Sequence, residues 1–365
     1  MALSSRNVLE RLLRPAGGGL HVVSTGRAAQ ESLQRRLYGL DDLSDLPARH
    51  AHDLDRLRDA TWLLLGVPSD VGAGVRRGAN LGPAGIREAL LRGAPDWRAT
   101  CERHGVVDIG DVFCVPQLLH DEMLSATQRD ATARALFSDL DDVTRATLPV
   151  SPLSIEERVL DLCMTINPRL KPLVLGGDHS VAWPVVSSLV KARGPSFAIV
   201  QFDAHTDLLP ERLGIKLCFA TWSFHANDLL GRGGRLCQLG VRASRFDRTH
   251  WESTLGVRQW WGDACRERPA EVIDGLCNHL DSLGISAVYV SNDIDGTDAA
   301  EAPATGTPEP GGPSPAFVRE VIRRVRDRFE VIGGDLCEVA PPLSSVNEAD
   351  RTCDVAASYI RALVD

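Results

Sequence analysis

The sequence lacks features that mark several classes of protein. No apolar run approaches the ~20 residues that a membrane-spanning helix needs, so we expect no membrane segment. There is no basic excess either, because 40 Lys and Arg residues stand against 49 Asp and Glu, for a formal net charge of −9. Proteins that bind nucleic acid carry a basic patch or stripe. We therefore expect no nucleic-acid partner.

The nine cysteines form no CxxC pair and follow no regular spacing. No secretory signal peptide is visible at the N-terminus. Disulfide bonds persist mainly in oxidising compartments, and such a chain is expected to keep its thiols reduced and mostly buried. These absences predict a cytoplasmic protein.

The N-terminal part of the chain differs in composition from the rest. Its first 36 residues contain six Arg and only two Glu. A transit peptide can have this composition, but we favour an N-terminal extension over residues 1–58 that is loosely ordered or packs on the domain. Residues 59–365 are predicted to form a single domain, because α/β folds often reach this length as one unit.

Beyond the extension, apolar segments that end in Gly or Asp alternate with amphipathic stretches. The predicted strands are Trp62–Val67, Val106–Ile109, Pro172–Leu175, Phe197–Phe202, Leu236–Val241, Ala287–Ser291 and Phe329–Ile332. The predicted helices are Pro83–Leu91, Asp121–Thr147, Ser154–Thr165, Val181–Lys191, Pro269–Leu283 and Ser314–Arg328. This alternation predicts an α/β fold with a parallel sheet covered on both faces. Ligands of such sheets bind outside the carboxyl ends of the strands.

Three of the predicted strands run into loops rich in Asp and His. The loops are GGDHS (176–180), DAHTD (203–207) and NDIDGTD (292–298). Alternate residues of an extended segment face the same side, so each loop can direct its ionisable groups into one shared space. The candidate groups are His179, Asp203, His205, Asp207, Asp293 and Asp295.

Four crowded carboxylates would repel one another unless a cation neutralised them. A lone Asp after a strand is usually a turn or cap residue, but capping does not explain three such loops. Imidazole and carboxylate together suit a divalent metal, with Mn²⁺ as first choice and Zn, Fe, Co or Ni as alternatives. Six ligands are enough for two metals that share carboxylates. Such a centre supplies a nucleophile at neutral pH and favours a cationic substrate.

The three loops resemble, in order, the metal-binding signatures of the arginase/agmatinase (ureohydrolase) family. The resemblance covers roughly residues 60 to 363. It extends to four further segments, which are GVPSDVGAGVRRGANLGPAGIREAL (66–90), DIGDV (108–112), ATGTPEPGG (304–312) and GGDLCEVAPPL (333–343). It implies a three-layer αβα domain with a mainly parallel sheet of about eight strands.

The resemblance also implies roles for individual residues. One Mn²⁺ would be bound by His179, Asp203, Asp207 and Asp293, and the second by His205, Asp203, Asp293 and Asp295. Glu338 matches a carboxylate that pairs with the substrate's guanidinium, and Asp207 and Glu338 join the catalytic set. His225 is the candidate proton shuttle, although Ala226 follows it where the family has Gly, and a packing role is an alternative.

The loop after DAHTD departs from the arginase and agmatinase patterns. It contains Trp222 and Asn227, which we take as candidate substrate-binding residues, with a core position as the alternative for Trp222. The polar residues with which arginase holds an α-amino acid are not recognisable here. Arginine is therefore not favoured as the substrate.

The resemblance implies a dinuclear manganese hydrolase that releases urea from a small cationic guanidino compound. Agmatine, ω-guanidino acids and guanidine are the candidate substrates. One alternative is a formimino-compound hydrolase of the formimidoylglutamase type, which would release formamide. A second alternative is a non-catalytic homologue that keeps its metals as a structural staple. Members of the family usually form homo-oligomers, and we expect a trimer or hexamer.

Overall fold

A nine-stranded sheet forms the centre of the protein, whose computed structural model describes residues 3–94 and 96–365. The strand order is β1-β3-β2-β4-β9-β8-β5-β6-β7, and every pair is parallel except β1 with β3. The strands are β1 (Leu13–Arg14), β2 (Trp62–Val67), β3 (Val106–Val112), β4 (Lys171–Gly176), β5 (Ala198–Phe202), β6 (Leu236–Val241), β7 (Arg258–Trp261), β8 (Ala287–Asp293) and β9 (Glu330–Cys337).

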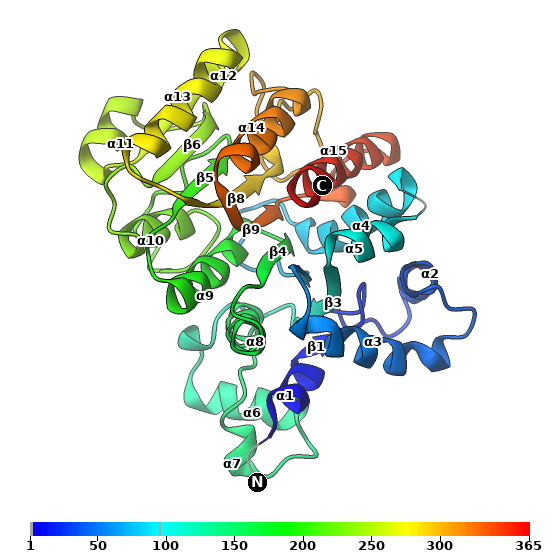
Figure 1. Cartoon of the computed structure of the whole chain (residues 1–365). Coiled ribbons are helices and arrows are strands. Elements are labelled where there is room, and N and C mark those ends of the chain that lie inside the picture. The colour runs from blue at the N-terminus through cyan, green and yellow to red at the C-terminus, as the bar shows by residue number, and fades with distance from the viewer. Residues whose placement is uncertain (1–2, 95) are drawn as a thin grey trace.

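Helices cover both faces of this sheet. They are α1 (Ser5–Leu12), α2 (Arg27–Tyr38), α3 (Leu46–Asp55), α4 (Gly82–Gly93), α5 (Trp97–His104), α6 (Ala126–Leu136), α7 (Asp142–Arg145), α8 (Pro152–Ile166), α9 (Ala182–Arg193), α10 (Trp222–Leu229), α11 (Arg248–Leu255), α12 (Gly262–Glu267), α13 (Pro269–Ser282), α14 (Pro315–Arg328) and α15 (Val346–Val364). In Figure 1, α8 and α9 lie on one side of the central strands, and α4, α14 and α15 lie on the other.

The strands place alternate apolar side chains in two separate cores. In β2, Leu63 and Leu65 join the core under α8 and α9, whereas Leu64 joins the core under α4, α14 and α15. This two-sided burial explains why the strands read as continuous apolar runs. The predicted three-layer αβα fold is confirmed, with eight parallel strands and one short antiparallel strand.

Residues 3–58 pack against the domain. On α1, Leu9 and Leu12 are each 1% exposed. The short strand β1 pairs with the edge strand β3, where Leu13 lies opposite Val112. The extension therefore caps an edge of the sheet that would otherwise present unpaired backbone groups.

Two expectations about local structure are corrected. The single helix predicted over Asp121–Thr147 is divided into a 3-10 turn, α6 and α7. The side chains of Ser125 and Asp141 accept hydrogen bonds from the backbone of Gln128 and Thr144, and these N-caps start two separate helices. The strand β7 was missed because it spans only four residues, two polar ones followed by two tryptophans.

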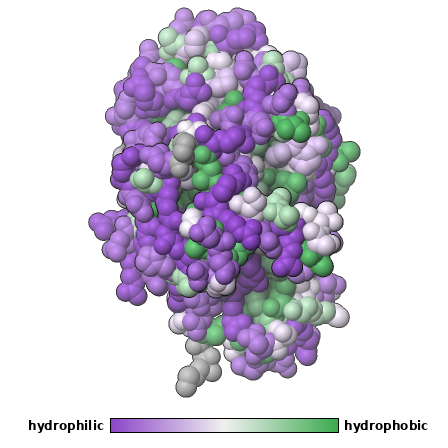
Figure 2. Space-filling model, turned by 90° about the vertical axis from the view of Figure 1, so that its right-hand side faces the viewer, coloured by the Kyte–Doolittle hydropathy of each residue, from purple (hydrophilic) through white to green (hydrophobic). Residues whose placement is uncertain are grey.

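The cysteines and the surface agree with the composition. Eight of the nine free thiols are buried and that of Cys101 is partly buried, as predicted. None of the described helices is both long and apolar enough to cross a membrane. Hydrophilic residues predominate on the face shown in Figure 2, with hydrophobic ones in small groups.

Arg87 on α4 is a fully buried cation that ties the N-terminal extension to the domain. Its guanidinium donates two hydrogen bonds to Asp108, both 2.9 Å long, and one of 2.5 Å to Asp111. The second oxygen of Asp111 accepts a hydrogen bond from the backbone N–H of Gly19 in the extension. The charge of Arg87 thus compensates the buried carboxylate of Asp111 and the partly buried one of Asp108.

We expect Arg87→Met to lower the free energy of unfolding by about 3–5 kcal/mol, because it leaves buried negative charge without a partner. Urea denaturation measures the change. The control is Arg92→Met, whose half-exposed pairs with Asp350 and Asp354 should contribute at most about 1 kcal/mol. Equal losses in the two variants would contradict the role given to Arg87.

Candidate metal centre and active site

The predicted site residues follow four strands that are neighbours in the sheet, β4, β9, β8 and β5. The register aligns the ends of these strands. Asp293 at the end of β8 lies opposite Cys337 of β9, one residue before Glu338, and Asn292 lies opposite Phe202 of β5. Segments that are far apart in the sequence therefore deliver their side chains to one place above the middle of the sheet.

His179 forms the centre of the first group. Its Nδ1 lies 3.3 Å from Asp203 Oδ2, 3.3 Å from Asp207 Oδ2 and 3.2 Å from Asp293 Oδ2. One ring nitrogen cannot serve three carboxylates, and Nδ1 is a buried atom without a well-formed hydrogen bond. A nitrogen and three oxygens that converge in this way are the donor set of a divalent cation.

His205 forms a second group on the other side of Asp203. Its Nδ1 lies 3.1 Å from Asp295 Oδ2 and 3.6 Å from Asp203 Oδ1. Asp203 therefore offers Oδ2 to the first group and Oδ1 to the second, as a carboxylate that bridges two ions does. Asp293 contributes to the first group, while its Oδ1 accepts a hydrogen bond from the backbone of Asp295. The structure therefore brings the six predicted ligands together in two groups, and their binding of metal stays a prediction.

Neighbouring side chains hold the ligands in place. Gln201 donates to Asp203 Oδ2 at 2.8 Å, and Thr307 donates to Asp295 Oδ2 at 2.8 Å. The indole of Trp222 donates to Asp207 Oδ2 at 3.1 Å. Such outer contacts fix the orientation of metal ligands and tune their basicity.

Behind His179 runs a buried chain of polar groups. Its Nε2 lies 2.9 Å from the hydroxyl of Ser291, which donates to Asp335 Oδ1 at 3.1 Å. Tyr289 donates to the other oxygen of Asp335. Asp335 and Ser291 were not predicted from the sequence, although an Asp inside the apolar strand β9 was a visible signal.

Two site residues have a backbone conformation that is rare outside glycine. Asp207 has a φ of 51° and Glu338 a φ of 63°. A left-handed non-glycine residue costs of order 1–3 kcal/mol and persists where the surroundings impose it. Both residues are held by hydrogen bonds, Asp207 through Trp222 and Glu338 through the backbone N–H of His179 at 3.0 Å.

The electrostatics of the site show that it lacks positive charge. Burial, followed by the charge of Asp203, raises the pKa of Asp207 to about 7. Burial and the charges of Asp295 and Asp203 raise the pKa of Asp293 well above its usual range. Burial alone would lower the pKa of His205, but its hydrogen bonds to Asp203 and Asp295 outweigh that effect and raise it to about 12. In the absence of metal, bound protons reduce the repulsion among these carboxylates. Bound cations would neutralise the same charge without protons.

The structure places the other predicted residues outside the two groups. Trp222 is fully buried against Asp207, and its ring lies 4.7 Å from that of His179. Asn227 is 1% exposed and donates to the carbonyl of Leu255. Neither side chain is free to meet a substrate. The predicted substrate contacts are therefore corrected: Trp222 supports Asp207, and Asn227 packs α10 against its neighbour.

His225 lies on α10 at a partly buried position. Its Nε2 is 3.0 Å from the carbonyl of Lys216, and its ring packs edge-on against Trp183 and Phe224. These contacts agree with a packing role for His225, and its role in proton transfer stays a prediction. Glu338 is 6% exposed, and burial followed by the charge of Asp178 raises its pKa well above the usual range.

Comparison with known proteins decides the family. The model of the arginase family matches residues 60–364. The chain belongs to the arginase family. It is accordingly a hydrolase, since its relatives are named for hydrolytic activities.

Two relatives and one solved structure illustrate the similarity. A guanidinobutyrase of Pseudomonas aeruginosa is 31% identical over 84% of this chain and 86% of its own. An agmatinase of Bacillus subtilis is 28% identical over 84% of this chain and 91% of its own. The proclavaminate amidino hydrolase of Streptomyces clavuligerus superposes with a TM-score of 0.64 at 25% identity, covering 84% of this arginase-family chain and 90% of that protein.

Two Mn²⁺ ions should bind to each metal-free chain, with release of protons, because ligands that hold protons must lose them. Acid should therefore weaken binding, by about tenfold or more for each pH unit below the pKa of about 7 at Asp207. Calorimetric titrations at several pH values, in buffers of different ionisation enthalpy, measure both effects. Asp203→Asn should lose both high-affinity sites, and the exposed control Asp41→Asn should keep them. Two unchanged sites in Asp203→Asn would contradict a shared carboxylate.

Asp335→Asn should weaken Mn²⁺ binding by about 10- to 100-fold, because the chain through Ser291 would no longer orient the ring of His179. Manganese titration of the folded variant measures the loss, and its melting temperature shows that it is folded. The exposed residue Asp327 provides the matched control, Asp327→Asn. An affinity within twofold of the unmodified protein would remove Asp335 from the support of the metal centre.

Proposed function

We propose that this protein hydrolyses a C–N bond of a small guanidino compound and releases urea and an amine, with two Mn²⁺ ions as cofactors. The observation that carries the proposal is the pair of His/Asp groups joined by Asp203. The names of the relatives, guanidinobutyrase, agmatinase and guanidino acid hydrolase, support a guanidino substrate.

The proposed ligand sets divide the six residues between the two ions. His179, Asp203, Asp207 and Asp293 would hold one ion, and His205, Asp203, Asp293 and Asp295 the other. Bound there, the two ions would supply a nucleophile at neutral pH and neutralise charge in the transition state. Four carboxylates balance the charge of two dications, so the loaded centre does not repel a cationic guanidinium.

Glu338 is proposed to bind the guanidinium of the substrate. One of its oxygens already accepts from the backbone of His179, which holds the side chain beside the first metal group. The other oxygen faces Gly306, where a Cβ would lie 3.9 Å away. A planar cation fits this carboxylate well because a guanidinium donates paired hydrogen bonds. Binding of that cation would also offset the cost of keeping the buried carboxylate ionised.

We propose proton-transfer roles for Asp207 and His225. We propose that Asp207, besides holding the first ion, accepts the proton of the nucleophile. His225 is the proposed donor to the leaving amine. Since its Nε2 contacts the carbonyl of Lys216, that role requires the other ring nitrogen or a movement of the loop.

The remaining proposals concern the assembled protein. By analogy with the family, we propose a cytoplasmic homo-oligomer, a trimer or hexamer. Light scattering of the purified protein measures its mass directly, and a chain mass of 39.6 kDa would rule the assembly out.

Purified, Mn²⁺-loaded protein should release urea from at least one member of a panel containing agmatine, 4-guanidinobutyrate, guanidine and arginine. We expect arginine to be the poorest of these, because the loop after β5 lacks a recognisable site for an α-amino acid. Asp203→Ala should abolish turnover while the protein stays folded. Glu338→Gln should raise the KM for every guanidinium substrate, since it removes the paired negative charge.

The alternatives give different products. Formamide from a formimino substrate such as formiminoglutamate, with no urea from any guanidine, would replace the proposal by a formimino hydrolase. Protein that binds manganese and turns over neither class would be a non-catalytic homologue. In that case Asp203→Ala would lower the melting temperature without any activity to lose.

A further inference from the structure

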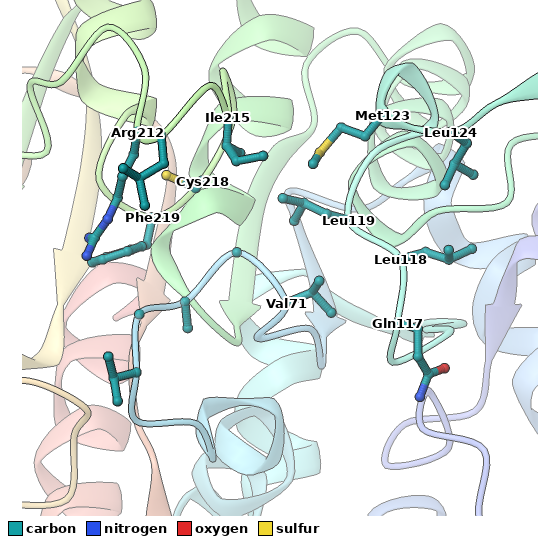
Figure 3. A pocket seen from close by; sticks show the side chains of 15 residues that line it. Val71, Gln117, Leu118, Leu119, Met123, Leu124, Arg212, Ile215, Cys218 and Phe219 are labelled. Atoms are coloured by element: carbon teal, nitrogen blue, oxygen red, sulfur yellow. The ribbon is translucent and has the colours of Figure 1, made fainter.

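A pocket of about 480 Å³ lies beside the metal centre and contributes no metal ligand. Three segments line it, residues 71–75 after β2, 117–124 after β3 and 212–219 after β5. Figure 3 shows Leu119, Met123 and Ile215 directed toward the same space. Its lining is mostly aliphatic, and Arg212 is the charged side chain among the lining residues that the structure describes.

The segment 71–77 connects this pocket to the catalytic centre. A Cβ on Gly72 would lie 2.7 Å from Ser180 Oγ and 2.8 Å from Asp178 Oδ1, the residues on either side of His179. Farther along, the carbonyl of Arg76 lies 3.3 Å from the Cβ position of Gly306, which is also the neighbour of Glu338. One wall of the pocket thus continues to the proposed guanidinium site.

Arg212 lies at the base of a tight hairpin on the rim. Its backbone exchanges two hydrogen bonds of 2.9 Å with Ile215. Leu213 and Gly214 between them have φ values of 52° and 82°, the pattern of a type I′ turn. Leu213, at the tip, is 97% exposed, as is Val75 on the facing segment. The rim therefore offers apolar surface that nothing in the chain covers, within the part that the structure describes.

The charge of Arg212 is available to a ligand. Its guanidinium lies 4.8 Å from the centre of the Phe219 ring, and it forms no salt bridge with any carboxylate of the described residues. Stacking on an aromatic ring leaves the edge of the guanidinium free to donate paired hydrogen bonds. A carboxylate is the ligand that matches this edge.

We propose that the pocket binds the tail of the substrate, and that the substrate is an ω-guanidino acid whose hydrocarbon spacer fills the pocket while its carboxylate pairs with Arg212. This inference rests on the proposed function. An ammonium tail such as that of agmatine would instead meet aliphatic walls and a like charge. The volume falls within the ~300–1,000 Å³ range of small-ligand sites, so spacers longer than three carbons are accommodated.

The test compares kcat/KM for four substrates of the Mn²⁺-loaded protein, with urea as the product. They are neutral butylguanidine, cationic agmatine, anionic 4-guanidinobutyrate and anionic 6-guanidinohexanoate. We expect 4-guanidinobutyrate to exceed agmatine by about tenfold or more, as one charged contact allows. The hexanoate should be better still, by up to about fourfold for each buried methylene, which is about 0.8 kcal/mol.

Two variants separate charge from apolar contact. Arg212→Glu should raise the KM of both acids about tenfold or more, lower or keep that of agmatine, and leave butylguanidine within twofold. Met123→Gln should weaken butylguanidine and the hexanoate more than agmatine, because Met123 is partly exposed in the pocket wall. The kcat values should change little, since the tail is remote from the bond that breaks.

The matched controls are Arg27→Glu and Val143→Gln, exposed positions that lie outside the pocket. Both should leave all four substrates unchanged. A preference of the unmodified protein for agmatine, or an equal effect of Arg212→Glu on acids and amines, would overturn the inference while urea release still upheld the proposed function. If no guanidino compound released urea, both the inference and the proposed function would be rejected.

Discussion

Burial of several carboxylates in one place is the constraint around which this protein is organised. The side chains concerned are at most 7% exposed, and they are Asp203, Asp207, Asp293 and Asp295. Removing an ionised carboxylate from water is costly unless a positive charge or several hydrogen bonds replace the solvent. Two imidazoles and the surrounding donors supply part of that compensation, and bound dications would supply the rest. The strand order brings these acids together, because β5 and β8, whose carboxyl ends carry them, are neighbours although they come from distant parts of the chain.

The same constraint explains the polar groups beneath the site. Gln201, Ser291 and Asp335 occupy fully buried positions within strands that are otherwise apolar. They are tolerated there because each forms hydrogen bonds to a ligand or to another member of the network. The left-handed backbone of Asp207 and Glu338 has the same origin. Fixing the ligands in defined positions strains the backbone at these two residues, and the rigid sheet below the site keeps them in that conformation.

The sequence alone was sufficient to predict the layers of the fold and to expect six Asp and His side chains at one edge of the sheet. Continuous apolar strands indicate that both faces of the sheet are buried. Asp or His residues at alternate positions after a strand indicate that their side chains point to the same side. Local patterns could not show tertiary contacts. Trp222 looked like a wall of the substrate pocket because it follows the DAHTD loop, but its indole turns inward to Asp207. Asn227 binds Leu255 for a similar reason, since α10 packs one side on its neighbours. From its Arg-rich composition the N-terminal extension was predicted to be loosely ordered or to pack on the domain, and its pairing with the edge of β3 and the contact of Gly19 with Asp111 explain why it packs.

Chemistry and selectivity are carried by different parts of the molecule. Strand ends hold the ionisable groups of the metal centre, and a sheet fixes their mutual positions to within the small tolerances that catalysis requires. The pocket beside it is built from three connecting segments, and its rim is a turn with Arg212 and Leu213 exposed. A connecting segment can change its length and side chains without disturbing the sheet. Arg212 can therefore determine which tail is accepted while the groups around Asp203 stay as they are. Because the pocket and the metal centre share segment 71–77 as a wall, a tail bound at Arg212 directs the attached guanidinium toward Glu338.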